Sequence, residues 1–316
     1  MRFSIHHKQN NLDVVVLQDS LTKTEAAVLP AFGALLHEFS LLINNNLINI
    51  IDNYESAENI KNELSVNFKS AKLSPFACRI PEGKYSFNKN DFEFQTKFMD
   101  GSAIHGLLYN KKFLLINEFA NDEKATITLQ YDYKKDDAGY PYNYRCEVEY
   151  VLSINNSLQI KTTVYNLSET IIPIADGWHP YFKLGGKIDD WLLQFNAESI
   201  LEFNNKLIPT GKLLTYNKFA EPRLIRDTEL DNCFLLNKNI SGAACTLINP
   251  LNKISLSFFP DKNYPYLQIF TPPNRASIAI ENLSAAPDAF NNKMGLTLLS
   301  ANSSQSFTVI YQTGIL

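Results

Sequence analysis

A two-residue alternation of apolar and polar side chains over residues 147–164 constrains the fold of this chain most strongly. Two alternating runs flank an Asn-Asn-Ser break at 155–157, and each run gathers its apolar side chains on one face: Val148, Tyr150, Leu152 and Ile154, then Leu158, Ile160, Thr162 and Val164. Successive side chains of a β-strand point to opposite faces, and asparagine-rich breaks favour tight turns. The segment therefore predicts a β-hairpin with a polar outer face.

Similar strand-like runs recur along the chain at 13–17, 84–87, 125–131, 191–195, 254–259, 266–270, 278–280 and 307–311. Helical signals are few, and the clearest is a short helix over 56–64 with Ser56 as its N-cap. Many short strands separated by turns predict an all-β protein, a large antiparallel β-sandwich with few short helices. No linker or repeat interrupts the chain, so we expect residues 1–316 to form a single domain.

The charge distribution argues against several classes of partner. The 316 residues include 29 basic and 33 acidic side chains, a formal net charge of −4, with no basic stripe for nucleic acid. The first 17 residues lack the apolar core of a signal peptide, and no apolar run is long enough to cross a bilayer. We expect a cytoplasmic protein that binds neither nucleic acid nor membrane.

The cysteines give no indication of a metal centre. Cys78, Cys146, Cys233 and Cys245 form no C-x-x-C pair, and no histidine stands at metal-ligand spacing beside them. We expect four reduced thiols that pack as small apolar side chains.

His179 has the most distinctive surroundings of the five histidines. It follows Trp178 and precedes Pro180, with two further aromatic residues directly behind. Proline fixes the backbone φ after the histidine, so this segment can hold an imidazole rigidly beside flat apolar faces. The C–H faces of sugars pack on such aromatic faces. The alternative, that these aromatic residues belong only to the core, stays open at this point.

Four further polar residues are candidates for a site. His105 precedes Gly106 among apolar residues, where a structural histidine is common. Glu281 follows the apolar run 278–280 and is either a solvated strand end or a desolvated base with a raised pKa. Arg79 and Asp231 are either surface charges or hydrogen-bonding arms for hydroxyl groups. The residues alone do not choose between these alternatives.

Taken together and in order, these segments resemble the aldose 1-epimerase (galactose mutarotase-like) family over nearly the whole chain. The most specific combination is His-Pro-Tyr-Phe at 179–182 with the distant Leu-Gln-Ile-Phe-Thr-Pro at 267–272 and Glu281. The resemblance is also carried by the segments 24–34, 78–85, 105–106, 138–141, 177–178, 209–211, 231–234 and 280–282.

The resemblance implies a galactose mutarotase-like β-supersandwich with a carbohydrate site in an open cleft. It implies that Glu281 is the catalytic base and His179 the proton donor. His105 matches the second active-site histidine of the family, and Arg79 and Asp231 match residues that hold sugar hydroxyls.

Such an isomerase would interconvert the α and β anomers of a free aldohexose by acid–base opening and closing of the ring, without a metal or other cofactor. Glu281 would be ionised and His179 cationic near neutral pH, since a nearby carboxylate favours the imidazolium. Trp178 or another aromatic residue would form a wall of the sugar site. We expect a monomer or homodimer.

Three alternatives remain open from the sequence. A hexose-6-phosphate 1-epimerase would need an additional cationic cluster for the phosphate, and no strong one adjoins these segments. A non-catalytic carbohydrate-binding protein of the same fold would not need both His179 and Glu281. A glycosidase would need two carboxylates that flank the scissile bond, and no comparable pair of motif carboxylates is evident.

Overall fold

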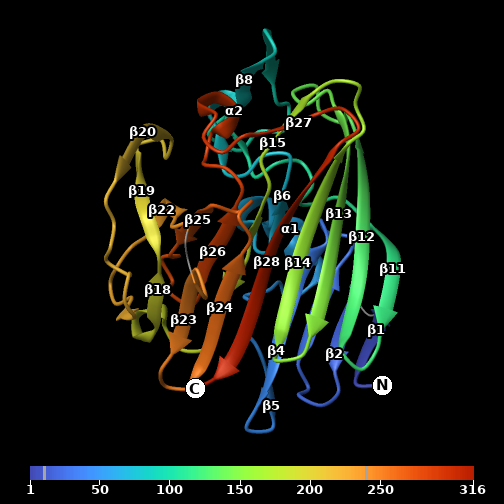
Figure 1. Ribbon diagram of the computed structural model, residues 1–316, viewed down its shortest axis with the longest axis vertical. Coiled ribbons are helices and arrows are strands. Elements are labelled where there is room, and N and C mark those ends of the chain that lie inside the picture. Colours follow the sequence, from blue (N-terminus) through green and yellow to red (C-terminus); the bar gives the residue numbers. More distant parts are fainter. Residues whose placement is uncertain (10–11, 239–240) are drawn as a thin grey trace.

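The computed structural model describes residues 1–9, 12–238 and 241–316, and three antiparallel sheets carry most of this part of the chain (Figure 1). The largest has nine strands, with the C-terminal strand at its middle. In spatial order they are β11 (Leu114–Ala120), β12 (Lys124–Lys134), β13 (Asn143–Ser153), β14 (Ser157–Asn166), β28 (Ser304–Ile315), β24 (Ile254–Pro260), β23 (Cys245–Asn249), β18 (Leu192–Phe195) and β21 (Arg223–Leu224).

The predicted hairpin is confirmed as β13 and β14. Ser153 pairs with Ser157, and buried residues alternate with half-buried ones along both strands. Asn155 and Asn156 turn the chain with positive φ angles of 62° and 52°, a conformation that asparagine tolerates better than most residues. Ile154 differs from the prediction, because it lies in the turn and is 48% exposed.

The second sheet has eight strands and carries the candidate site residues on β22, β16 and β26. Its strands, in spatial order, are β20 (Pro209–Leu214), β19 (Ala197–Phe203), β22 (Asp231–Leu236), β25 (Tyr266–Phe270), β26 (Ile278–Leu283), β16 (Gly177–His179) and β6 (Ala71–Leu73), and β17 (Tyr181–Phe182) pairs with β26 beside this path. All six residues of β26 are buried, so Glu281 lies inside a buried strand and not at a solvated strand end.

Aromatic side chains join the two large sheets face to face. Trp178 of β16 lies 6.2 Å from Tyr150 of β13, and Phe182 of β17 lies 5.5 Å from Tyr311 of β28, each distance measured between ring centroids. Burying a large apolar side chain contributes about 1.5–3 kcal/mol to stability, so these contacts are a substantial part of the core. The predicted all-β sandwich is confirmed.

A five-stranded sheet contacts one end of the nine-stranded sheet through β2 and β12 (Figure 1). Its strands are β1 (Phe3–Gln9), β2 (Asp13–Asp19), β3 (Glu25–Leu29), β4 (Leu35–Ile43) and β5 (Asn46–Asn49). Three strand pairs complete the architecture: β7 (Arg79–Ile80) with β10 (Ala103–Ile104), β8 (Lys84–Phe87) with β9 (Asn90–Glu93), and β15 (Ile172–Ile174) with β27 (Thr297–Leu299).

The predicted helix is confirmed as α1 (Ala57–Asn67). Its N-cap Ser56 accepts a hydrogen bond from the backbone N–H of Asn59, and Phe68 ends it in the left-handed conformation. The other helical segments in the described residues are short: α2 (Ala289–Asn292) and the 3-10 turns η1 (Pro81–Gly83) and η2 (Ile188–Asp190). Across the described ranges, no helix combines the length and the apolar character needed to cross a membrane.

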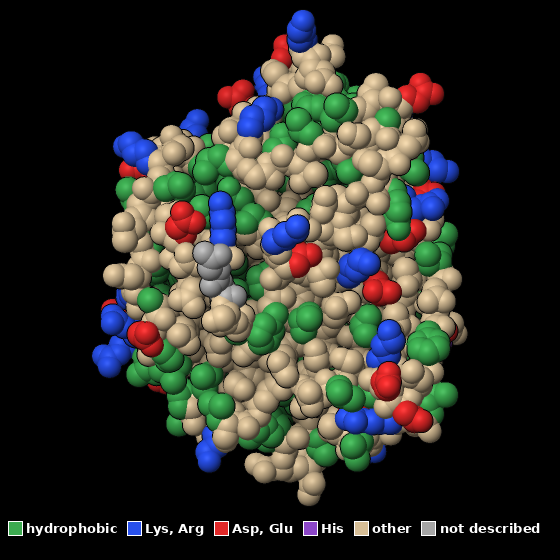
Figure 2. Space-filling model, viewed as in Figure 1, with side chains coloured by type: hydrophobic (Ala, Val, Ile, Leu, Met, Phe, Trp, Pro, Cys, Tyr) green, Lys and Arg blue, Asp and Glu red, His purple; other side chains and the backbone are tan. Residues whose placement is uncertain are grey.

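The surface carries charges of both signs. On the face shown in Figure 2, Lys and Arg side chains lie among Asp and Glu side chains and do not form a field of one sign. The four cysteines are free thiols and all are buried, as the sequence predicted.

Candidate active site

A cavity of about 340 Å³ brings together five of the six residues that the sequence singled out: Arg79, His105, His179, Asp231 and Glu281. These residues come from five separate segments of the chain. Apolar and aromatic side chains supply much of the remaining wall, among them Val66, Phe68, Phe98, Ile104, Tyr181, Phe203, Leu207, Phe270 and Pro287. A cavity of this size with a few convergent polar groups has the character of a small-molecule site.

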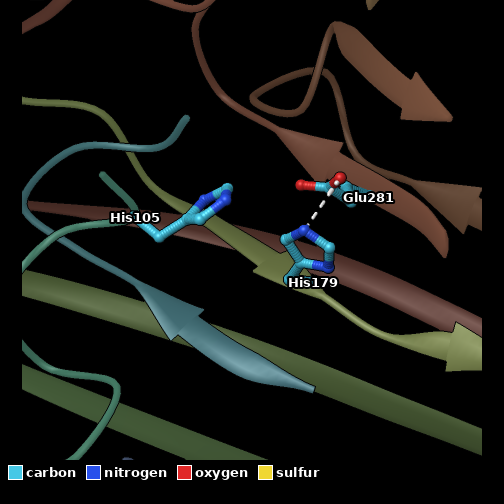
Figure 3. Close-up of side chains that lie close together, drawn as sticks. All are labelled: His105, His179 and Glu281. Carbon is cyan, nitrogen blue, oxygen red and sulfur yellow. Dashed lines mark ion pairs between the residues drawn. The ribbon is translucent and has the colours of Figure 1, made fainter. Parts of the chain in front are cut away.

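His179 and Glu281 form a close pair of titratable groups in the cavity. The Nε2 atom of His179 lies 3.4 Å from Oε1 of Glu281 (Figure 3). The pair is assembled by the sheet, because β16 and β26 are neighbours in which Gly177 pairs with Leu283. Only 6% of His179 and 2% of Glu281 are exposed, so both groups are largely removed from water.

His105 approaches the same point from a turn and not from a regular strand. Its φ is +58°, and its backbone N–H bonds the carbonyl of Cys78. The next residue, Gly106, has a φ of +79°, and a Cβ there would lie 2.3 Å from the carbonyl oxygen of Ser74. The His-Gly pair therefore has a steric cause, since only glycine lets the two backbone segments approach this closely.

The ring of His105 is held between two other rings. Its centroid lies 4.7 Å from that of Phe68 at the end of α1, and 4.8 Å from that of His179 in an edge-to-face arrangement. Figure 3 shows the three side chains converging, with His105 directed towards the His179–Glu281 pair. No functional role for Phe68 was predicted, because its place behind His105 depends on where α1 packs.

Arg79 and Asp231 line the same cavity. Arg79 is placed by the pairing of β7 with β10, which sets it opposite Ile104 and next to His105, and its guanidinium pairs with Asp100. The carboxylate of Asp231 accepts a hydrogen bond of 2.9 Å from Nε2 of Gln268. Burial raises the pKa of Asp231, while Gln268 and Arg79 oppose the shift.

Gln268 is a site residue to which the sequence reasoning gave no role of its own. It lies opposite Glu281 in the pairing of β25 with β26, and it lines the cavity. Its Oε1 atom is buried without a hydrogen-bond partner among the described residues. The available signal was a single polar residue inside the otherwise apolar run of β25.

The prediction that Trp178 forms a wall of the site is wrong. Alternate residues of a strand point to opposite faces, so Trp178 faces the core where His179 faces the cavity. The indole Nε1 donates to Oγ1 of Thr162, deep between the sheets. Tyr181 takes the expected place, because its ring stacks on that of His179 at 5.1 Å with an angle of 15°.

Burial controls the protonation of the pair. Desolvation lowers the pKa of His179 to about 4. Desolvation, assisted by the charge of Asp231, raises the pKa of Glu281 well above its usual range. Burial thus disfavours the charged form of both groups, which opposes the expected ionised Glu281 beside a cationic His179 in the protein without sugar.

The sequence model of the family described as aldose 1-epimerase matches residues 13–312. The Escherichia coli K12 protein YihR, whose name describes it as uncharacterized, is 25% identical over 235 residues, which cover 72% of this chain and 74% of YihR.

Solved structures share the architecture at low sequence identity. A galactose mutarotase-like protein from Clostridium acetobutylicum superposes with a TM-score of 0.88 at 17% identity, covering 100% of this chain and 99% of the other. A galactose 1-epimerase from Lactobacillus acidophilus NCFM gives a TM-score of 0.79 at 20% identity and covers 99% and 98% of the two chains. At this level of identity, the likeness concerns the fold alone.

Proposed function

Because this chain belongs to the aldose 1-epimerase family, we propose that it interconverts the α and β anomers of a free, unphosphorylated aldohexose. The family makes the protein an isomerase that acts on a small sugar. The observation that carries the finer proposal is the His179–Glu281 pair, with 3.4 Å between Nε2 and Oε1, on the wall of a cavity of about 340 Å³.

The proposed reaction needs one proton donor and one proton acceptor. The carboxylate of Glu281 accepts the proton of the C1 hydroxyl while the imidazolium of His179 protonates the ring oxygen, and the C1–O5 bond breaks to give the aldehyde. Rotation about C1–C2 and the reverse proton transfers close the ring from the other carbonyl face. A group of this kind typically contributes roughly 10²- to 10⁴-fold to the rate.

One proton shared by the pair suits this cycle. Burial favours the neutral acid of Glu281 in the protein alone, and ring opening also leaves the proton on Glu281. A C1 hydroxyl that donates a hydrogen bond to Glu281 stabilises the carboxylate form, so sugar binding moves the proton to His179. The donor and acceptor thus exchange roles in each half-reaction without net uptake of a proton.

The surrounding residues have proposed positioning roles. His105 would hydrogen-bond the ring oxygen or an adjacent hydroxyl, and Arg79 with Asp231 would fix the hydroxyls further round the ring. Gln268, whose carbonyl oxygen has no hydrogen-bond partner in the described part of the chain, offers one more acceptor. Tyr181 and Phe270 offer aromatic faces to the C–H groups of the sugar.

The charge of the cavity supports a neutral sugar over a sugar phosphate. Among the described residues that line it, Arg79 is the one Lys or Arg side chain, and Asp100 already neutralises it. Asp231 and Glu281 add two acidic groups to the same wall. A phosphate dianion would meet these acidic groups without a cationic cluster to hold it.

We also propose that the chain acts as a single domain. Glu281, His179 and Asp231 lie on the eight-stranded sheet, whereas Arg79 and His105 come from a strand pair and turn outside it. This distribution over the chain supports one cooperative unit.

Polarimetry of freshly dissolved α-glucose and α-galactose, with and without protein, tests the function. We expect the approach to anomeric equilibrium to accelerate in proportion to protein concentration, and hexose 6-phosphate neither to react nor to compete. Saturable sugar binding without acceleration would instead support a carbohydrate-binding protein. Faster turnover of the 6-phosphate would reject the neutral-sugar proposal and leave the acid–base pair in place.

A further inference from the structure

His105, His179 and Glu281 offer ligand atoms that all lie within 4.8 Å of one another. The three side chains are at most 8% exposed, yet they face a cavity open to small molecules. Nε2 of His179 and Oε1 of Glu281 face one another in this cluster, at 3.4 Å. Nδ1 of each histidine is buried and has no hydrogen-bond partner among the described residues, so no protein group that the structure describes fixes which ring nitrogen carries the proton.

We propose that these three residues form a binding site for a divalent transition-metal ion such as Zn²⁺. Binding of the ion and binding of the sugar exclude one another. Zn–N and Zn–O bonds are about 2.0–2.2 Å, which places tetrahedral ligand atoms roughly 3.4 Å apart. The His179–Glu281 separation of 3.4 Å already fits this geometry. The remaining separations are at most 4.8 Å, so these ligand atoms would have to move closer together to bind one ion.

The donor set selects the class of metal. Two imidazole nitrogens and one carboxylate suit Zn²⁺, Co²⁺, Ni²⁺ and Cu²⁺, whereas Mg²⁺ and Ca²⁺ prefer oxygen ligands alone. Three protein ligands leave a fourth position open towards the cavity for water. The carboxylate of Asp231 lines the same cavity and adds negative charge near a bound dication.

Competition with the sugar follows from shared atoms, and this part of the inference rests on the proposed function. The groups that would bind the metal are those proposed to transfer protons to and from C1–OH and the ring oxygen. A bound ion would occupy the lone pairs of the base and the acid together. We therefore expect Zn²⁺ to inhibit mutarotation, with inhibition relieved by saturating sugar.

Calorimetric titration of the full chain with ZnCl₂ tests the site without relying on activity. We expect one saturable site, at least about tenfold weaker binding in His105→Ala and in Glu281→Gln, and no comparable site for MgCl₂. The conservative Glu281→Gln variant keeps the test valid if His105→Ala does not fold. CoCl₂ should develop the intensified visible absorption of nitrogen-ligated Co²⁺ only when both residues are intact.

The double variant His6→Gln/His7→Gln is the matched control, because these neighbouring histidines lie on the exposed strand β1 far along the chain from the site. It should bind Zn²⁺ as the unaltered protein does. Loss of binding in this control, or unchanged binding in Glu281→Gln, would overturn the proposal. Zn²⁺ binding without any mutarotation would support the metal site and reject the proposed function. Mutarotation without Zn²⁺ binding would support the proposed function and reject the metal site.

Discussion

Lys72 and Asp176 form an ion pair in which Nζ lies 2.6 Å from Oδ2, and both side chains are completely excluded from solvent. Tyr264 donates a further hydrogen bond to Oδ1 of Asp176, and the ammonium lies 4.6 Å from the ring centroid of Trp178. Lys72 pairs with Trp178 across β6 and β16, one residue before His179. The ion pair thus lies beside β16, the strand that carries the proposed acid His179.

Lys72→Met should lower the free energy of unfolding by about 3–5 kcal/mol, because it leaves the buried carboxyl of Asp176 without its cation. Urea denaturation followed by fluorescence measures the change. Lys69→Met is the control, since its partner Asp52 is partly exposed and such pairs contribute about 1 kcal/mol or less. Equal effects of the two substitutions would contradict this account of the buried pair.

Glu281→Gln should reduce kcat for mutarotation by roughly 10²- to 10⁴-fold, because the amide keeps the shape of the side chain but cannot accept the C1 proton. Polarimetry gives the rate, and calorimetry with the sugar checks that binding persists. Glu198→Gln, at an exposed position on β19, should retain full activity. A nearly unaltered rate for the Glu281 variant would remove this residue from the mechanism.

The pH profile of kcat/KM should have its acid limb near pH 4. Below the His179 pKa of about 4, the imidazole is protonated while the carboxyl of Glu281 also holds a proton. Neither group can then accept the proton of the C1 hydroxyl. Activity should therefore rise with pH through that value and fall again once Glu281, whose pKa is raised by burial, loses the shared proton. Initial rates corrected for buffer catalysis give the profile. An acid limb near 6.5 would mean that His179 titrates as a solvated imidazole.

Gly106→Ala should lower the free energy of unfolding by about 2–5 kcal/mol. This is the sum of the cost of an alanine in the left-handed conformation and the cost of a steric overlap. The added Cβ would lie 2.3 Å from the Ser74 carbonyl oxygen, so the turn must shift and take His105 with it. We expect a higher KM in any variant that folds. Gly186→Ala is the matched control, because its φ of +70° is similar but no atom lies within 4 Å of the new Cβ. Comparable decreases in the unfolding temperature of the two variants would show that the contact with Ser74 is unimportant.

Local periodicity was sufficient to predict much of the fold. The β13–β14 hairpin, the run that became β25 and the N-cap Ser56 were all evident in the sequence, since each depends on residues within a few positions of one another. Strand ends were less certain: β26 extends to Leu283, beyond the predicted run 278–280. The extension is decided by pairing with β25, a contact that no local pattern encodes.

The sequence by itself determined the alternation that makes this chain a β-sandwich, and the residues that resemble a sugar-isomerising site. Tertiary structure decided the direction and the environment of those residues. It turned Trp178 into the core, set Phe68 behind His105 and placed Gln268 beside Glu281. It also raised the pKa of Glu281, because desolvation depends on every segment that closes around a group and not on its neighbours in the chain.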